Sequence, residues 1–182
     1  MNQILRGVFA TDSGMLAIWS RERFLSITDY GSWERELLED ADIIRHIEVG
    51  AYVPINIQSD GAFACEVRYG DTNSPAELSE REKKFLVVAS DRYLFRSAGE
   101  LFISGIEHVE REPGSGVGRL CIPAGCYSAI VHIIGWDDEP GAKTADGKPA
   151  STALPDFVIL LNPIPSEGGD FRKKVDTFEE PA

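Results

Sequence analysis

Residues 120–134 read Leu-Cys-Ile-Pro-Ala-Gly-Cys-Tyr-Ser-Ala-Ile-Val-His-Ile-Ile. A short apolar run, a Pro-Ala-Gly turn and a longer apolar run follow one another, as in two antiparallel strands joined by a turn. Glycine at position 125 supplies the positive φ that such turns require. This stretch therefore predicts a pair of neighbouring β-strands and indicates the element type to look for elsewhere in the chain.

Strand-like runs of the same kind recur along the chain. They lie at residues 15–19, 53–57, 63–69, 85–89, 93–95, 101–103 and 157–161. Two of them, at 85–88 and 157–161, are continuously apolar, which is typical of strands buried on both faces. We predict an all-β fold, a two-sheet antiparallel β-sandwich of about eight strands.

One or two short helices are expected between the strands. In residues 32–41, Trp33, Leu37 and Ala41 recur at helical spacing and form a stripe that faces the core. Residues 74–77 (Ser-Pro-Ala-Glu) have the form of a capping box with proline in the first helical position. They predict a second, short helix on the surface.

The two halves of the chain resemble each other. Residues 14–18 are similar to residues 99–103, and the paired runs within 55–67 are similar to those within 120–131. Each half would supply four strands whose apolar faces need a cover, and the other half is the natural cover. This similarity predicts an internal duplication, although the sandwich itself does not depend on it.

The expected domain organisation follows from these patterns. We predict a single β-sandwich domain over residues 1–163, with half-repeats at 12–90 and 91–163. Residues 137–153 form a long loop of small and polar residues. Residues 164–182 contain Pro, Gly and a Glu-Glu-Pro-Ala end, and we expect them to form a flexible tail.

The overall charge restricts the class of partner. The chain has 182 residues, with 18 Lys and Arg against 30 Asp and Glu, and a formal net charge of −12. This charge repels phosphate groups, so it argues against nucleic acid and anionic membrane and favours a basic protein partner. Acidity that only keeps a protein dispersed remains an alternative.

Cysteine usage and hydropathy indicate a cytoplasmic protein. Cys65, Cys121 and Cys126 cannot all pair within one chain, and we expect them to be reduced, with a Cys121–Cys126 bridge across the turn as the alternative. The apolar stretch near the N-terminus is broken by Asp12, so it makes a poor signal peptide. No run approaches the ~18–20 apolar residues that a bilayer requires.

Signatures of catalysis are missing from the sequence. His46 and His108 lie in charged stretches, and His132 lies in an apolar strand where a hydrogen-bonded core position is expected. No metal-ligand spacing, nucleophile elbow or phosphate-binding loop is present. We therefore assign no catalytic residue, no metal and no cofactor. The alternative is a small-ligand-binding protein or a hydrolase, with a carboxylate pocket at the sandwich end near Trp136.

Acidic residues gather in two insertions. Residues 29–48 hold seven acids and two bases, and residues 137–153 hold four acids and two bases. An aromatic anchor surrounded by carboxylates suits a basic partner such as a nuclease or toxin. The candidate partner-binding residues are Trp33, Glu36, Glu39, Asp40, Trp136, Asp137, Asp138 and Glu139. In the alternative, Trp33 packs in the core, Trp136 covers a strand end, and the acids are only solvated.

Three segments of the chain resemble the ComJ-like competence family. They are Lys-Lys-Phe-Leu-Val-Val at 83–88, Gly-Glu-Leu-Phe-Ile at 99–103 and Leu-Cys-Ile-Pro-Ala-Gly-Cys-Tyr at 120–127, followed by a last apolar strand. The resemblance implies a β-sandwich and, from the best-known member, binding and inhibition of a DNA-entry nuclease. It carries over no individual binding residue. The chain is also similar to uncharacterised acidic bacterial proteins of comparable length.

Overall fold

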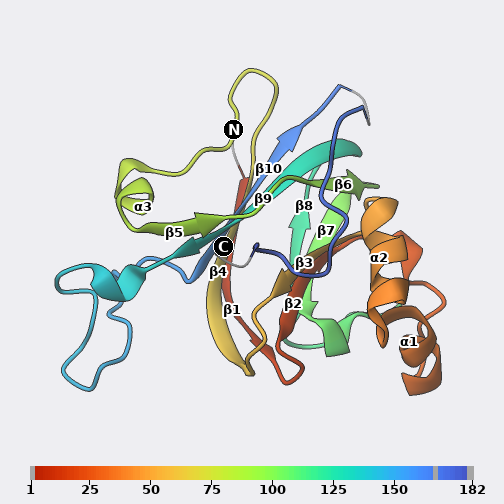
Figure 1. Ribbon diagram of the computed structural model, residues 1–182, viewed down its shortest axis with the longest axis horizontal. Helices are drawn as coiled ribbons and strands as arrows, with labels where there is room; N and C mark the ends of the chain where they lie inside the picture. Colours follow the sequence, from red (N-terminus) through yellow and green to blue (C-terminus); the bar gives the residue numbers. More distant parts are fainter. Residues whose placement is uncertain (1–2, 166–167, 180–182) are drawn as a thin grey trace.

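The computed structural model describes residues 3–165 and 168–179. Within these residues, ten strands form two sheets that pack against each other (Figure 1). The strands are β1 (Gln3–Thr11), β2 (Met15–Trp19), β3 (Tyr52–Asn56), β4 (Gly61–Tyr69), β5 (Leu86–Ala89), β6 (Tyr93–Ser97), β7 (Glu100–Gly105), β8 (Gly118–Cys121), β9 (Gly125–Ile134) and β10 (Phe157–Pro163). The predicted all-β sandwich is confirmed, with ten strands in place of about eight.

The first and last described strands, β1 and β10, lie in the same sheet. The six-stranded sheet has the order β1-β4-β10-β9-β5, with β6 also paired to β9, and the four-stranded sheet has the order β3-β2-β7-β8. β10 runs parallel to β4, whereas the seven other pairings among the described strands are antiparallel. The six-stranded sheet is therefore a mixed sheet, whereas the prediction is a sandwich of purely antiparallel sheets.

The main core lies between the inner faces of the two sheets. Alternate residues of a strand point to opposite faces, so each strand contributes every second side chain. Val67, Val131 and Ile159 from the six-stranded sheet and Ile18 and Ile103 from the four-stranded sheet are fully buried in one apolar cluster. This shared core makes the two sheets one packed unit.

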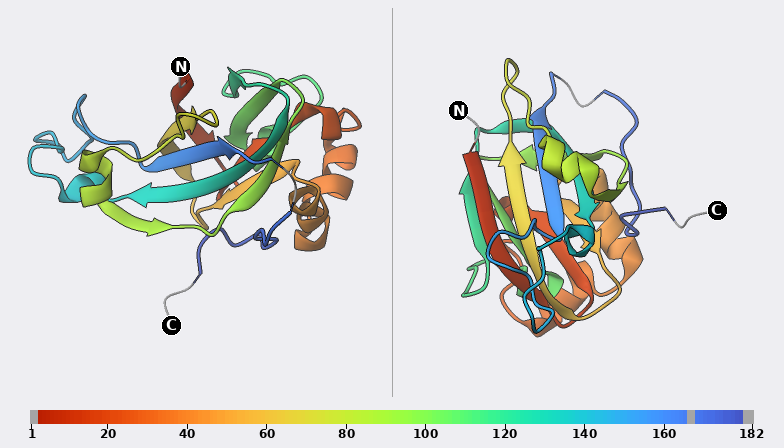
Figure 2. Two further views of the ribbon diagram at one scale, coloured as in Figure 1. Left: turned by 90° about the horizontal axis from the view of Figure 1, so that it is seen from above. Right: turned by 90° about the vertical axis from the view of Figure 1, so that its left-hand side faces the viewer.

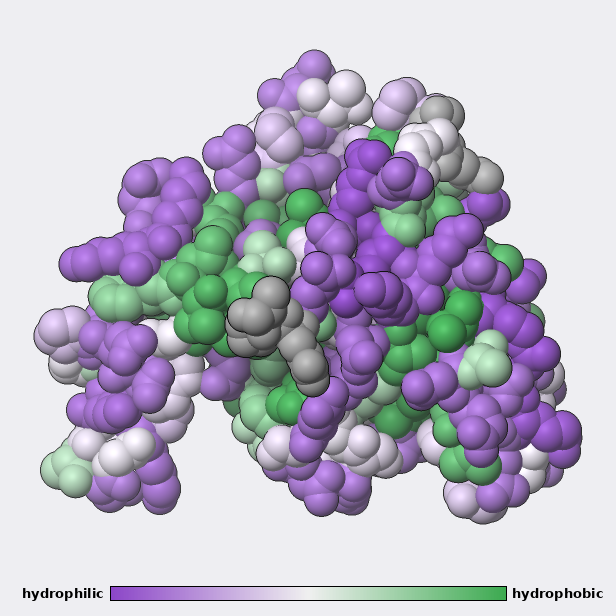
Figure 3. Space-filling view, viewed as in Figure 1, coloured by the Kyte–Doolittle hydropathy of each residue, from purple (hydrophilic) through white to green (hydrophobic). Residues whose placement is uncertain are grey.

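The two continuously apolar runs have different environments. β10 is buried on both faces, because Val158 and Leu160 on its outer side pack with Ala76 in a second apolar cluster. β5 lies at the edge of the sheet, and Val87 is 63% exposed. Figure 3 shows an apolar patch over this strand. The prediction of two-sided burial is confirmed for β10 and wrong for β5.

In the part of the chain that the structure describes, three α-helices accompany the strands. They are α1 (Tyr30–Leu37), α2 (Asp40–Glu48) and α3 (Glu80–Lys84). The single helix expected at 32–41 is thus two, because a break at Leu38–Glu39 separates them. The first begins with a capping box between Asp29 and Ser32.

The short surface helix predicted to begin at residues 74–77 and to include Glu80 and Lys84 is present as α3, but it begins later in the chain than predicted. The backbone of Ser74 pairs with Asp71, and the N–H of Ala76 donates to the side chain of Asn162, so these groups are engaged in a turn. The helix forms five residues later, after Ser79, whose hydroxyl accepts from the N–H of Glu82. Both segments read Ser-x-x-Glu, and tertiary hydrogen bonds decide between them.

The segment expected to be a flexible tail docks on the sandwich in its described part. Arg172, Val175 and Thr177 are buried. The Thr177 hydroxyl accepts from the N–H of Asn56 and donates to the carbonyl of Pro54, each at 2.8 Å. These bonds cover part of the edge strand β3, whose polar backbone would otherwise face solvent. Isolated anchors of this kind leave no periodic pattern in the sequence.

The strand pairing is compatible with an internal duplication. β2 and β7 are paired at the centre of the four-stranded sheet, with β3 and β8 on their outer sides. In the other sheet, β1 pairs with β4 as β6 pairs with β9. Duplication, the half-repeats and the boundary at residue 163 stay predictions.

Candidate functional site

The eight predicted partner-binding residues lie at opposite ends of the molecule. Trp33 and Glu36 belong to α1, and Glu39 and Asp40 lie where α2 begins. Residues 136–139 belong to the short 3-10 helix η3 (Trp136–Asp138) and the residue after it. Figures 1 and 2 show α1 and α2 at one end of the long axis and the loop after β9 at the other. The structure therefore does not bring the two sets together.

The carboxylates at the loop end are engaged within the chain. Glu139 accepts from Arg81 Nε at 2.7 Å and from Arg81 Nη2 at 2.6 Å. The hydrogen bond from Arg81 holds the pKa of Glu139 below its usual value. Asp137 lies 3.4 Å from the ammonium of Lys143. Two of the three acids predicted here are thus already paired with cations.

Trp136 has an internal partner as well. Its indole N–H donates to Asp156 Oδ1 at 2.8 Å, and the other oxygen of Asp156 accepts from the N–H of Ala64. The ring therefore fixes the loop between β9 and β10 against β4. This agrees with the alternative in which Trp136 serves the local structure.

A groove of about 680 Å³ lies at this end, where the pocket of the alternative function was expected. It is lined by Trp136 and residues 149–156 of the loop, and by charged side chains from β1, β4 and α3. Three of those side chains are arginines, Arg6, Arg68 and Arg81. The groove thus has a cationic side, but each arginine has a carboxylate partner.

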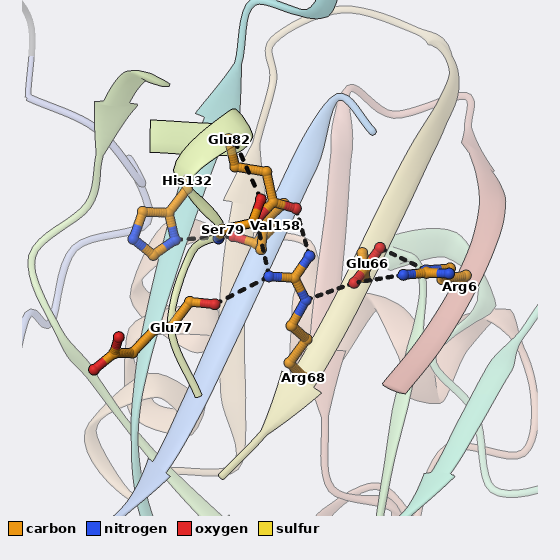
Figure 4. A network of polar contacts seen from close by, with 8 residues as sticks. All are labelled: Arg6, Glu66, Arg68, Glu77, Ser79, Glu82, His132 and Val158. Atoms are coloured by element: carbon orange, nitrogen blue, oxygen red, sulfur yellow. Dashed lines mark hydrogen bonds and ion pairs between the residues drawn. The ribbon is translucent and has the colours of Figure 1, made fainter. Parts of the chain in front are cut away.

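Figure 4 shows the arginine–carboxylate network beside this groove. Arg6 Nε donates to Glu66 at 2.6 Å, Arg68 Nε donates to the other oxygen of Glu66 at 2.5 Å, and Arg68 Nη1 donates to Glu82 at 2.9 Å. Burial acts to raise the pKa of Glu82, but hydrogen bonds from Arg68 and Ser79 outweigh it, and the pKa lies below its usual value. A general acid needs the opposite shift, so Glu82 is not tuned for acid catalysis.

His132 lies next to this network and is also structural. Its Nδ1 is 3.0 Å from the carbonyl oxygen of Val158, and the ring is buried. Burial lowers the pKa of this imidazole. The expectation of a hydrogen-bonded core histidine is confirmed.

The helix end carries a second groove, of about 520 Å³, between α1 and the segment that follows the 3-10 helix η2 (Ile106–His108). Tyr30 is 68% exposed, and its ring stacks on that of Trp33 with centroids 5.9 Å apart. The indole N–H of Trp33 donates to the carbonyl of Ile106 at 2.9 Å, which fixes its ring. Trp33 therefore packs on the core cluster and lines the groove at once.

Carboxylates border this helix-end groove. Asp29, Glu107 and Glu110 line it, and none of its described lining residues is a lysine or arginine. Asp29 caps α1, and the backbone hydrogen bond from Ser32 lowers its pKa. Glu107 accepts from the N–H of Asp12 at 2.9 Å. These contacts orient two of the carboxylates without neutralising their charge.

The other predicted residues of this end differ in their surroundings. Glu36 lies 2.9 Å from His46 Nε2 and joins α1 to α2. Glu39 and Asp40 are exposed and form no ion pair with any residue that the structure describes. They continue the acidic border beyond the groove. Sequence reasoning missed the contributions of Tyr30 and Leu38.

The described residues show neither a metal cluster nor a spanning helix. Across 3–165 and 168–179, no three His, Cys, Asp or Glu side chains are grouped so that they could hold a metal ion. Within the same ranges, every helix is too short or too polar to span a bilayer. All three cysteines are free, and Cys65 is buried.

The two packed sheets define a β-sandwich, and similarity to two solved structures identifies its fold as ComJ-like. A solved structure described as crocagin biosynthetic gene J is similar, with a TM-score of 0.60 and 14% identity over 90% of this chain and 98% of that one. ComJ from Bacillus subtilis, described as an inhibitor of the DNA degrading activity of NucA, is similar with a TM-score of 0.51 and 10% identity over 90% of this chain and 99% of that one. The chain matches no protein-family model and no curated protein.

Proposed function

We propose that this chain is a non-enzymatic, cytoplasmic inhibitor that binds a basic protein, either a nuclease or a toxin. The observation that carries the proposal is the ComJ-like fold over 90% of the chain, since ComJ is described as the inhibitor of a nuclease. The other similar structure, crocagin biosynthetic gene J, is described by a biosynthetic role. The fold alone therefore does not select one function. Surface charge supports the choice.

The acidic border at the helix end is the proposed contact surface. Residues 29–48 carry a charge of 2 − 7 = −5, and Glu39 and Asp40 are left without an internal ion pair among the described residues. Charge of one sign on a partner-facing surface accelerates association and rejects partners of the same sign. A nuclease carries positive charge where it binds DNA, so this surface and DNA would compete for it.

A plasmid-degradation assay tests the proposal. NucA from Bacillus subtilis and a panel of other basic nucleases are assayed with increasing amounts of the protein, at about 50 mM and about 500 mM salt. We expect stoichiometric inhibition of at least one nuclease at low salt and weaker inhibition at high salt. Failure to inhibit any member of the panel, or inhibition that does not respond to salt, contradicts the proposal.

The loop-end groove is the specific observation that favours the second candidate, a small-ligand-binding protein. Its volume of about 680 Å³ is in the range of ligand pockets, and Trp136 offers an aromatic wall. The paired state of its arginines and the lowered pKa of Glu82 argue against a hydrolase with an acid in this groove. A thermal-shift screen of small carboxylates against the wild type and Trp136→Phe examines this candidate directly.

A further inference from the structure

We propose that the groove between α1 and residues 107–110 is a subsite for an arginine or lysine side chain of the partner protein. This inference rests on the proposed function and adds the chemistry of its central contact. The groove of about 520 Å³ has an apolar floor and an acidic border. Ile27, Trp33 and Val109 form part of the floor, and Asp29, Glu107 and Glu110 belong to the border.

The aromatic pair provides a surface for a cation. The rings of Tyr30 and Trp33 are nearly parallel, at 16°, and Tyr30 is 68% exposed. The hydrogen bond from Trp33 to Ile106 fixes the indole before any partner arrives. A cation over such a ring face gains energy from the ring quadrupole, and its aliphatic stem gains from apolar contact.

The carboxylates supply the charge that selects a cation. Three of them line the groove, and no lysine or arginine is present among its described lining residues. In the loop-end groove, by contrast, Arg6, Arg68 and Arg81 occupy the neighbouring carboxylates. The helix-end groove therefore presents three carboxylates beside an aromatic surface, with no lysine or arginine in its described lining, and is complementary to one guanidinium or ammonium group.

The surroundings favour a protein side chain over a free cation. Leu38 lines the groove and is 50% exposed, and Glu39 and Asp40 follow it directly in the chain. The groove thus continues into an acidic surface that a partner would cover together with it. Exposed aromatic and aliphatic side chains within a charged border are the usual anchors of protein interfaces.

A pair of blocked tripeptides tests the subsite without the unknown partner. Acetyl-Gly-Arg-Gly-amide and its neutral counterpart with citrulline in place of arginine are titrated into the ¹⁵N-labelled full chain. We expect the arginine peptide to shift the indole N–H of Trp33 and amides of residues 27–38 and 107–110. The citrulline peptide should bind about tenfold more weakly, because it lacks the charge.

Variants with matched controls localise the binding. Tyr30→Ala and Glu110→Gln should each weaken binding of the arginine peptide by about threefold to fivefold. Val87→Ala and Glu80→Gln change exposed residues far from the groove and should leave the affinity unchanged. Folding of each variant is checked from its dispersed amide spectrum.

Each outcome of this titration has a definite consequence. Equal binding of the two peptides, shifts outside the groove, or no shifts at all would overturn the subsite. Those results would leave nuclease inhibition to be judged by the plasmid assay. Peptide binding in the groove without inhibition of any nuclease would support the subsite and contradict the proposed function, so the two failures are distinguishable.

Discussion

The guanidinium of Arg68 on β4 binds the carboxylate of Glu82 on α3 through both terminal nitrogens. The side chains are 13% and 3% exposed, so the pair lies under α3, on the outer face of the sheet. Glu82 also accepts from the hydroxyl and the backbone N–H of Ser79. One carboxylate therefore caps the helix and attaches it to the sheet.

Glu82→Ala should lower the free energy of unfolding by about 2 kcal/mol, because it leaves a largely buried arginine with one partner fewer and removes the capping box. Glu66 keeps part of the charge compensation for Arg68, which limits the loss. Urea unfolding measures the change. Glu80→Ala on the same helix is the control, since the Glu80 side chain is 90% exposed and its loss should cost under about 0.5 kcal/mol. Equal losses would contradict this account.

His46 should make the protein less stable in mild acid. Its Nε2 contacts Glu36, while Nδ1 is buried without a hydrogen-bond partner among the described residues, and the ring lies against Phe24. Burial lowers the pKa of His46, with further lowering by Arg23 and Arg45, and this outweighs the raising effect of Glu36. The folded state therefore binds the proton less tightly than the unfolded state.

The sign of the pH dependence follows from that difference. Between the folded pKa and the unfolded value of about 6.5, the unfolded chain holds more protons, so the free energy of unfolding falls as the pH is lowered. His46 contributes at most about 1.4 kcal/mol per pH unit to the slope of the free energy of unfolding. His132, whose pKa is also lowered, contributes to the slope in the same direction. Urea unfolding of the wild type and of His46→Gln from pH 7 to pH 5 measures the slope. A variant with an unchanged slope would exclude His46 as a source.

Thr177 should anchor the C-terminal segment to β3. Thr177→Val keeps the shape but leaves the N–H of Asn56 and the carbonyl of Pro54 without their partner, and should cost about 2 kcal/mol. Hydrogen exchange at Asn56 should accelerate in the variant. Thr152→Val, at an exposed position, is the matched control. Slow exchange at Asn56 in Thr177→Val would show that another contact holds the segment.

Patterns of apolar and polar residues predicted two kinds of strand: those with one apolar and one polar face, and those buried on both faces. The stretch at 120–134 forms β8 and β9, and the run at 157–161 lies in β10. β1 was missed because its residues do not alternate clearly: Ile4 and Val8 are exposed, at 46% and 69%, and Gly7 interrupts the apolar side. Exposure of an apolar residue depends on what covers the sheet, and the sequence of one strand does not contain that information.

The helix-end groove was only half predictable for the same reason. Its aromatic anchor, Trp33, and the acids after it stood out by composition. Glu107 and Glu110 come from a segment some 70 residues later, which docks on α1 through the bond from Trp33 to Ile106. The pairing of Glu139 with Arg81, which removes the loop end from the acidic surface, likewise joins segments 58 residues apart.

Charge reversal at the two ends should separate the two predicted surfaces. Glu39→Lys with Asp40→Lys reverses exposed acids at the helix end, and Asp137→Lys with Asp138→Lys makes the same change in net charge at the loop end. We expect the first pair to weaken the affinity for the inhibited nuclease by at least about tenfold at low salt, mainly by slowing association. The reason is that Glu39 and Asp40 lie at the proposed contact surface. The second pair should weaken it by less than about threefold, through the overall field alone. Association and dissociation rates at two salt concentrations measure both effects. Equal effects of the two pairs would mean that the partner responds to net charge, and a larger effect of the second would move the interface to the loop end.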